Sequence, residues 1–252
     1  MNTTTEGHLS KVPEVTLVFW VIKIAATTFG ETAGDAVSMS LNLGYLIGTV
    51  IFAAIFVGAV GAQIAAKRFQ PFLYWTTIIA STTVGTTFAD FADRSLGIGY
   101  TGGTSILLAL LLTSLYAWYR TLGSISIDTV SSPKAEIFYW VTIMFSQTLG
   151  TALGDWTADS AGLGYAGAAL VFGALLAIVV AGYLWTAVSR TLLFWAAFVL
   201  TRPLGAVVGD FLDKPVSEGG LALSRFSASA VLLVFIVACI MVFRQRAART
   251  SH

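Results

Sequence analysis

Four aspartates recur at one position of an internal repeat, and they are the residues best suited to chemistry. Asp35, Asp90, Asp155 and Asp210 each directly follow a glycine or an alanine in a strongly apolar chain. Carboxylate oxygens are preferred ligands of hard cations such as Mn²⁺, Mg²⁺ and Ca²⁺. Carboxylates that crowd together repel one another unless a cation or a proton neutralises them. The four residues therefore predict a cation site.

Further oxygen atoms are expected beside these aspartates. Glu31 lies one helical turn before Asp35, on the same face of the helix. The predicted metal ligands are therefore the four repeated aspartates and Glu31. The hydroxyl groups expected to assist them belong to Thr28, Thr83, Thr86 and Thr151.

A few charged residues differ between the repeats. Arg202 stands where the other repeats have Thr27, Thr82 and Gln147. Two interpretations stay open: Arg202 pairs with Glu31 across a closed ring of helices, or it gates the passage of charge while Glu31 carries a proton or a metal.

The remaining charges are placed by their sequence neighbours. Asp93 and Asp213 are each followed by a base, Arg94 and Lys214, and we expect these pairs at the rim of the site with the two bases in solvated loops. Lys23 is expected to extend its side chain to the cytoplasmic interface.

A structural role for the repeated aspartates is the alternative to a cation site. Gly-Asp is a turn signal, and an aspartate can cap a helix by accepting hydrogen bonds from free backbone N–H groups. In that case Asn would replace Asp with little effect.

The repeat itself is defined by five residues at fixed offsets. Trp20, Trp75, Trp140 and Trp195 are each followed after ten residues by Gly, after fourteen by Gly or Ala, after fifteen by Asp and after twenty-four by Gly. Such self-similarity identifies a repeat architecture. We expect the tryptophans near the inner interface, where they contribute to helix packing. The predicted repeats cover about 14–66, 72–120, 136–188 and 192–244, with a linker at 121–134, in one transmembrane domain spanning 1–252.

Composition places these repeats in a membrane. Hydrophobic residues make up 56% of the chain, charged residues 11%, and the mean hydropathy is +0.82. Each repeat holds two apolar segments, and about 20 residues of helix cross the hydrocarbon layer. The predicted fold class is an all-α integral membrane protein with eight spans in four parallel two-helix repeats, with a pseudo-twofold (quasi-fourfold) axis along the membrane normal. The spans are about 14–35, 43–66, 72–91, 99–119, 136–156, 164–188, 192–211 and 221–243.

Lys and Arg predict the orientation. On the side with both termini lie Lys11, Lys67, Arg68, Arg120, Lys134, Arg190, Arg244, Arg246 and Arg249, whereas the opposite loops hold Arg94, Lys214 and Arg225. Because positive residues favour the cytoplasmic side, both termini are predicted to be cytoplasmic and the four aspartates to lie near the outer surface.

The Trp–Gly–Asp pattern resembles a family of bacterial membrane-anchored proteins built of four tandem two-helix repeats, each marked by a tryptophan and catalogued as a repeat of unknown function. The resemblance covers about Trp20 to Phe243 and implies a multi-pass protein of the bacterial inner membrane. It implies no particular activity. The segment from Glu31 to Asp35 also resembles, loosely, the Glu-x-Gly-Asp motif of a family of Ca²⁺ and Mn²⁺ transporters. It has one inserted residue and lacks the following base.

Other classes of function find little support. The histidines are His8 and His252, at the ends of the chain, so no histidine-based metal or catalytic site is expected within the helices, and no cofactor is predicted. Neither a phosphate-binding loop nor a basic nucleic-acid face is found. The predicted function is transport of a divalent metal cation, Mn²⁺ first, with the lipid bilayer and the cation as partners and no enzyme activity. The alternatives are a membrane scaffold or sensor with structural acids, and a proton-coupled carrier of an organic cation.

Overall fold

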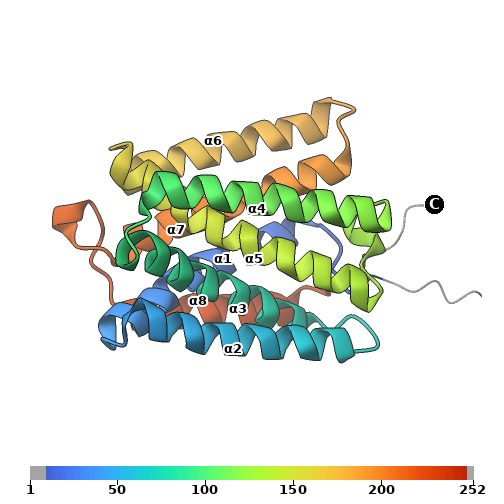
Figure 1. Ribbon diagram of the computed structural model, residues 1–252, viewed down its shortest axis with the longest axis horizontal. Helices are drawn as coiled ribbons and strands as arrows, with labels where there is room; N and C mark the ends of the chain where they lie inside the picture. The colour runs from blue at the N-terminus through green and yellow to red at the C-terminus, as the bar shows by residue number, and fades with distance from the viewer. Residues whose placement is uncertain (1–9, 249–252) are drawn as a thin grey trace, which may run out of the picture.

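Eight α-helices make up most of the part of the chain that the structure, a computed structural model, describes, namely residues 10–248 (Figure 1). His8, Arg249 and His252 lie outside these residues. Each helix falls close to one of the apolar segments predicted from the sequence. The helices are α1 Leu17–Asp35, α2 Gly44–Ala65, α3 Pro71–Asp90, α4 Gly99–Leu122, α5 Pro133–Asp155, α6 Gly164–Trp185, α7 Arg190–Asp213 and α8 Arg225–Val242.

Five of these helices, α2, α4, α6, α7 and α8, are long and apolar enough to cross a membrane. Among them α2, α6 and α8 bury little of their surface inside the protein and turn large apolar side chains outward. Such extensive apolar exposure is typical of a surface in contact with lipid. The helices α1, α3 and α5 are less apolar because they carry the repeated Thr, Ser and Asp residues, most of which are buried between helices.

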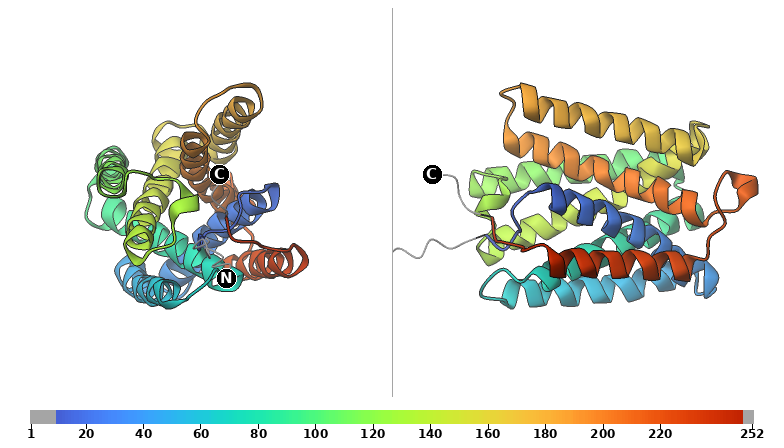
Figure 2. Two further views of the ribbon diagram at one scale, coloured as in Figure 1. Left: turned by 90° about the vertical axis from the view of Figure 1, so that its right-hand side faces the viewer. Right: turned by 180° about the vertical axis from the view of Figure 1, so that it is seen from behind.

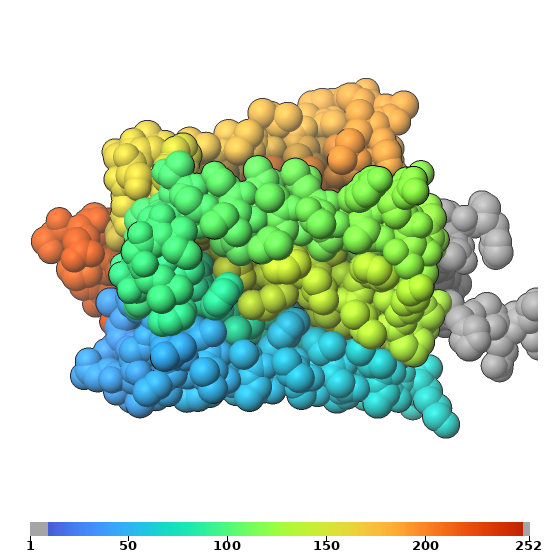
Figure 3. Space-filling view, viewed as in Figure 1, coloured from blue at the N-terminus to red at the C-terminus, as the bar shows by residue number. Residues whose placement is uncertain are grey.

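The first helices of the four repeats form a closed inner ring. In this ring α1 packs against α3 and α7, and α5 packs against the same two helices. The second helices lie outside, and each packs on the first helix of the following repeat: α2 on α3, α4 on α5, α6 on α7, and α8 back on α1. Figure 1 shows α2 and α6 on opposite sides of the bundle, and the left view of Figure 2 looks along the helices. On the face shown in Figure 3, α5 is visible between α2 and α4. Every repeat is therefore fastened to the next.

Glycines let the ring helices approach closely. At each interface, the first glycine of one repeat faces the residue three positions before the equivalent glycine of the neighbouring helix: Gly30 faces Thr82, Gly85 faces Gln147, Gly150 faces Arg202 and Gly205 faces Thr27. A Cβ atom at Gly205 would overlap the Thr27 side chain and lie 3.0 Å from the Thr27 carbonyl carbon. Because the backbone is that near, a smaller neighbour would not relieve the overlap. The repeated glycine is thus a packing requirement.

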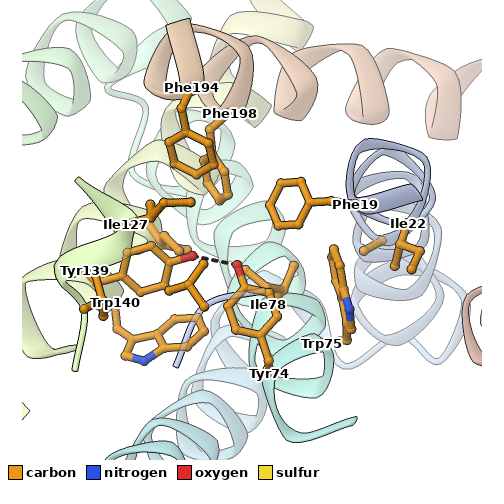
Figure 4. Close-up of a cluster of buried hydrophobic side chains, with 14 of the residues drawn as sticks. Phe19, Ile22, Tyr74, Trp75, Ile78, Ile127, Tyr139, Trp140, Phe194 and Phe198 are labelled. Carbon is orange, nitrogen blue, oxygen red and sulfur yellow. Dashed lines mark hydrogen bonds between the residues drawn. The ribbon is translucent and has the colours of Figure 1, made fainter. Parts of the chain in front are cut away.

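Aromatic side chains close the ring at the end where the chain begins. Figure 4 shows Phe19, Tyr74, Trp75, Tyr139 and Phe194 converging from different helices, with the Tyr74 and Tyr139 hydroxyls 2.6 Å apart. The expected packing role of the repeated tryptophans is confirmed. Trp75, Trp140 and Trp195 are buried in this cluster, and Trp20 is partly buried and packs against it.

The chain between the two halves folds back under this aromatic cluster. Ser10 Oγ donates to the Ile127 carbonyl at 2.6 Å, and Trp195 Nε1 donates to the Ile125 carbonyl at 3.0 Å. Nearby, Pro13 and Ala247 form an isolated antiparallel bridge. Residues near both ends of the chain and the linker therefore gather at the same end of the bundle.

Replacing Gly205 by alanine tests the close approach in the ring. Gly205→Ala should lower the free energy of unfolding by about 1–3 kcal/mol, because the methyl group has no space against α1. Gly58→Ala is the matched control, since a Cβ there meets no atom within 4 Å. It should leave stability unchanged or raise it slightly, because alanine is the better helix former. Thermal unfolding in detergent measures both, and equal melting temperatures for the two variants would contradict the packing described.

Candidate metal and charge cluster

The repeated aspartates lie at the end of the ring opposite the aromatic cluster, and they do not cap helices. After Asp35, Asp90 and Asp155 the chain continues into π-helical turns, Ala36–Ser40, Phe91–Ser95 and Trp156–Ser160, and none of these three side chains makes a capping hydrogen bond. Asp210 lies inside α7, which ends at Asp213. The capping interpretation is therefore wrong for the first three aspartates, because the helical backbone continues past them and leaves no free N–H groups to cap.

Two bases of the chain itself contact all four aspartates. Lys214 Nζ contacts Asp35 and lies 3.1 Å from Asp210 Oδ1. Arg94 lies 2.8 Å from Asp90 Oδ1 through Nε and 3.5 Å from Asp155 Oδ2 through Nη2. Each base follows the aspartate of its own repeat by four residues, so it can fold back onto that aspartate and also reach the aspartate of a neighbouring helix.

The expectation that Lys214 is a solvated loop residue is therefore wrong, whereas the Arg94 side chain is 36% exposed although it pairs with two aspartates. Lys214 is 7% exposed. Burial alone would lower the pKa of its ammonium, but Asp210 and Asp35 outweigh burial and raise this pKa. The pKa of Arg94 is raised in the same way by Asp90 and Asp155. Both bases consequently carry charge at neutral pH and neutralise the aspartates.

Asp93 and Asp213 occupy one repeat position but have different surroundings. Asp213 lies 3.0 Å from Arg225 Nε at the start of α8, and Arg225 also reaches Asp35 at 3.8 Å. Both Asp93 oxygens lack a hydrogen-bond partner among residues 10–248. Burial raises the pKa of Asp93, which Arg94 partly opposes. The expected pairs of Asp93 with Arg94 and of Asp213 with Lys214 are not found among the described ion pairs.

Arg225 was missed as a site residue. Its signal in the sequence was its position inside the predicted span 221–243, since an ionisable side chain within an apolar span usually marks function or pairing.

Arg202 and Glu31 pair across α7 and α1, as one of the two interpretations expected. Arg202 is fully buried, and its Nη2 donates to Glu31 Oε2 at 3.0 Å, to Thr86 Oγ1 at 2.6 Å and to Thr151 Oγ1. Thr86 in turn donates to Glu31 Oε2 at 3.2 Å. Two more Arg202 nitrogens, Nε and Nη1, have no partner within residues 10–248. The pair and its two threonine partners thus link all four ring helices directly below the aspartates.

The other predicted hydroxyl ligands face their own helices. Thr28 Oγ1 donates to the Ile24 carbonyl at 3.0 Å, and Thr83 Oγ1 donates to the Ile79 carbonyl at 2.8 Å. No hydrogen bond from either hydroxyl to a carboxylate is found in the described part of the chain. Of the four predicted threonines, the structure brings Thr86 and Thr151 to the charged residues.

Lys23 does not extend to an interface, so that expectation is wrong. Its side chain is fully buried, and Nζ has no hydrogen-bond partner among residues 10–248. The amine lies 4.1 Å from the centre of the Phe198 ring. Lys23 lies on the ring-facing side of α1, two turns before Glu31, and packing there encloses it.

Two triads of carboxylates are close enough to share a metal ion. One consists of Glu31, Asp35 and Asp90, the other of Asp35, Asp210 and Asp213, and in each triad one oxygen per residue lies within 4.8 Å of the others. Asp35 belongs to both. Asp155, the fourth predicted ligand, belongs to neither triad and is joined to Asp90 through Arg94. All five of these triad residues are buried, and their donor set consists of oxygen atoms alone.

Comparisons with known proteins agree with this architecture of repeats. The model of a protein family described as "Repeat of Unknown Function (DUF347)" matches residues 18–69, 73–124, 138–189 and 193–248. Searches of curated proteins and of solved structures each found no match. Because the four tandem matches cover most of its 252 residues, the chain belongs to this DUF347 repeat family.

Proposed function

We propose that the protein spans the bacterial inner membrane eight times and transports a divalent metal cation, Mn²⁺ as the first candidate, through the carboxylate triads. The observation that carries this proposal is the convergence of carboxylates from three ring helices on Asp35, which both triads share. Oxygen-only sites of several carboxylates suit hard divalent cations.

The orientation proposed from the basic residues puts both ends of the chain in the cytoplasm and the aspartates at the outer end. Four two-helix units related by an axis along the membrane normal would give the inner ring this single polar end. With Cys239 replaced by alanine, Ser95→Cys should react with a membrane-impermeant maleimide added to intact cells. Lys67→Cys, at the other end of the bundle, should react only after the cells are opened. The reverse pattern would contradict the orientation.

The excess of buried carboxylates over bases at the aspartate end favours a cation as the substrate. Seven buried carboxylates gather there, whereas four bases contact them: Arg94, Arg202, Lys214 and Arg225. In formal charge, three carboxylates are left over. Buried carboxylates in excess of their partners are costly unless a proton or a metal ion neutralises them. A divalent cation at either triad would supply most of the positive charge needed to neutralise these three carboxylates.

Lys214 gives the proposed site a means to release its ion. Its ammonium contacts Asp35 and Asp210, two of the three carboxylates of the second triad. A metal ion and this ammonium therefore compete for the same oxygens. Lys214 follows the last residue of α7, where the outer loop begins, so a shift of that loop would withdraw or return the ammonium. We propose that Lys214 serves as a tethered counterion that takes the place of the substrate.

Asparagine substitutions test the ligands. Asp35→Asn should abolish Mn²⁺ uptake into proteoliposomes, because loss of one buried charged ligand costs a few kcal/mol, or roughly 100-fold or more in affinity. Asp210→Asn should weaken uptake similarly, and Asp155→Asn, outside both triads, should weaken it less. Asp159→Asn is the control, since Asp159 is an exposed acid at the same end.

A second substitution tests the competition. Lys214→Gln should bind Mn²⁺ more tightly, by roughly tenfold if the ammonium contributes about 1.4 kcal/mol of competition, while its transport becomes slower because release is no longer assisted. Isothermal titration calorimetry measures the affinity, and Lys67→Gln, an exposed lysine at the other end, is the control. Affinity that is unchanged or weaker in Lys214→Gln argues against a tethered counterion.

A scaffold is the second candidate function, and one observation favours it: each repeated aspartate already contacts a base of the chain. In that case the ion pairs only hold the ring together. Asparagine variants and Lys214→Gln would then lower the melting temperature, and the native protein would neither bind nor transport Mn²⁺, Mg²⁺ or Ca²⁺. Proton-driven uptake of an organic cation, insensitive to these metals, would instead indicate the third class considered from the sequence.

A further inference from the structure

A trough opens on the side of the bundle between α1, α6 and α7, at the end where the chain begins and far from the aspartates. Its volume is about 790 Å³. Apolar side chains such as Trp20, Ile24, Leu176 and Phe194 line most of it, and the linker at 126–128 covers one end. Volumes of this order are typical of sites for small molecules.

Three charged side chains lie at one end of this trough. They are Glu14, before α1; Asp128, in the linker; and Arg190, the first residue of α7. None of the three takes part in an ion pair within 4.0 Å found among residues 10–248. The mouth of the trough therefore carries two negative groups and one positive group that have no ion-pair partner among residues 10–248.

Local contacts hold these groups in place. The Arg190 guanidinium lies 4.2 Å from the centre of the Tyr183 ring and donates from Nη1 to the Tyr183 carbonyl. Its other N–H groups make no hydrogen bond within the described part of the chain and can donate to a ligand. Asp128 accepts from Ser126 Oγ at 3.4 Å. The Glu14 segment is fixed by a backbone hydrogen bond of 2.9 Å from Glu14 N to the Arg246 carbonyl. The charges thus belong to ordered parts of the fold.

The trough extends inward from its charged mouth. Along α7 it is lined from Arg190 to Thr201, and these eleven steps of helix span about 16 Å at about 1.5 Å per residue. This is a depth suited to an alkyl chain that enters the apolar layer of a membrane. A ligand that fits must therefore combine a long apolar tail with a head group that carries both charges.

We propose that the trough is a binding site for one phospholipid with a primary ammonium head group, such as phosphatidylethanolamine. Arg190 would bind the phosphate, since a guanidinium donates two parallel hydrogen bonds to phosphate oxygens. Glu14 and Asp128 accept hydrogen bonds from the ammonium, and one acyl chain lies along Trp20, Ile24 and Phe194. An anionic head group meets repulsion from the two acids. A choline head group has no N–H to donate to them. The proposal is independent of cation transport.

Lipid titration of the full-length protein tests this site. The delipidated protein in detergent is titrated with phosphatidylethanolamine, phosphatidylcholine or phosphatidylglycerol of the same acyl chains, and bound lipids are counted by native mass spectrometry. One phosphatidylethanolamine should bind at least tenfold more tightly than either of the other lipids. The double variant Glu14→Gln with Asp128→Asn should erase this preference. The variant Arg190→Gln should weaken the binding of all three lipids. Glu218→Gln, an exposed acid at the opposite end, should behave as the native protein.

Two further measurements distinguish a bound phospholipid from other occupants of the trough. Val180→Trp fills the trough from α6, where Val180 is 56% exposed, and should abolish the tight site without affecting folding. Glycerophosphoethanolamine, which lacks acyl chains, should not compete. Equal affinities for the three lipids in the native protein, or an unchanged preference in the acid double variant, would overturn the proposal. So would competition by glycerophosphoethanolamine, or a dimer that Val180→Trp disrupts.

Discussion

Carboxylates enclosed between apolar helices must be neutralised, and this constraint accounts for much of the structure. The inner ring brings aspartates from four helices to one end, where water is largely excluded. Charges in such surroundings are costly unless they are paired and hydrogen-bonded. The chain meets the requirement with Lys214 and Arg94, each of which joins two aspartates of different helices. The ion pairs thereby act as cross-links of the ring as well as counterions.

Close packing below the aspartates makes the pairing possible. Each ring interface has a glycine against the neighbouring helix, so the backbones approach and the polar side chains reach across. Arg202 is the extreme case, since it packs on Gly150 and contacts Glu31, Thr86 and Thr151. Helix association in lipid relies on packing and hydrogen bonds, because the surrounding acyl chains are as apolar as the helices. The repeated glycines therefore allow the close helix approach that the buried polar contacts between the ring helices require.

The ring is polar at one end, apolar at the other and blocked in between. An ion that reaches the aspartates meets Arg202 next and then the aromatic cluster around Trp75 and Tyr139. Transport by the proposed route therefore needs a second arrangement in which the ring opens toward the end where the chain begins. The outer helices suggest how the repeats would stay together, because each is fastened to the ring helix of the next repeat. Such a change would have to break the ion pairs of Lys214 and the packing around Arg202.

The sequence by itself determined the number of helices, their approximate bounds and the four-repeat organisation. Spacing of Trp, Gly and Asp is a local property of the chain, and apolar length alone predicts where a helix forms. It also placed Glu31 and Asp35 on one polar face of a single helix, since residues three and four apart share a side of a helix, and the repeat put Asp90 at the equivalent position of another helix.

Only the tertiary structure decided the partners of these groups. Lys214 and Arg94 were assigned to solvated loops because their sequence neighbours are acids, yet they fold back onto aspartates of two helices each. Lys23 was assigned to an interface and is enclosed beside Phe198. Asp155 matches the other aspartates in sequence, but it lies outside both carboxylate triads. The physical reason is that pairing of charges depends on distances across helices, which the close packing of the ring sets and the local pattern does not contain.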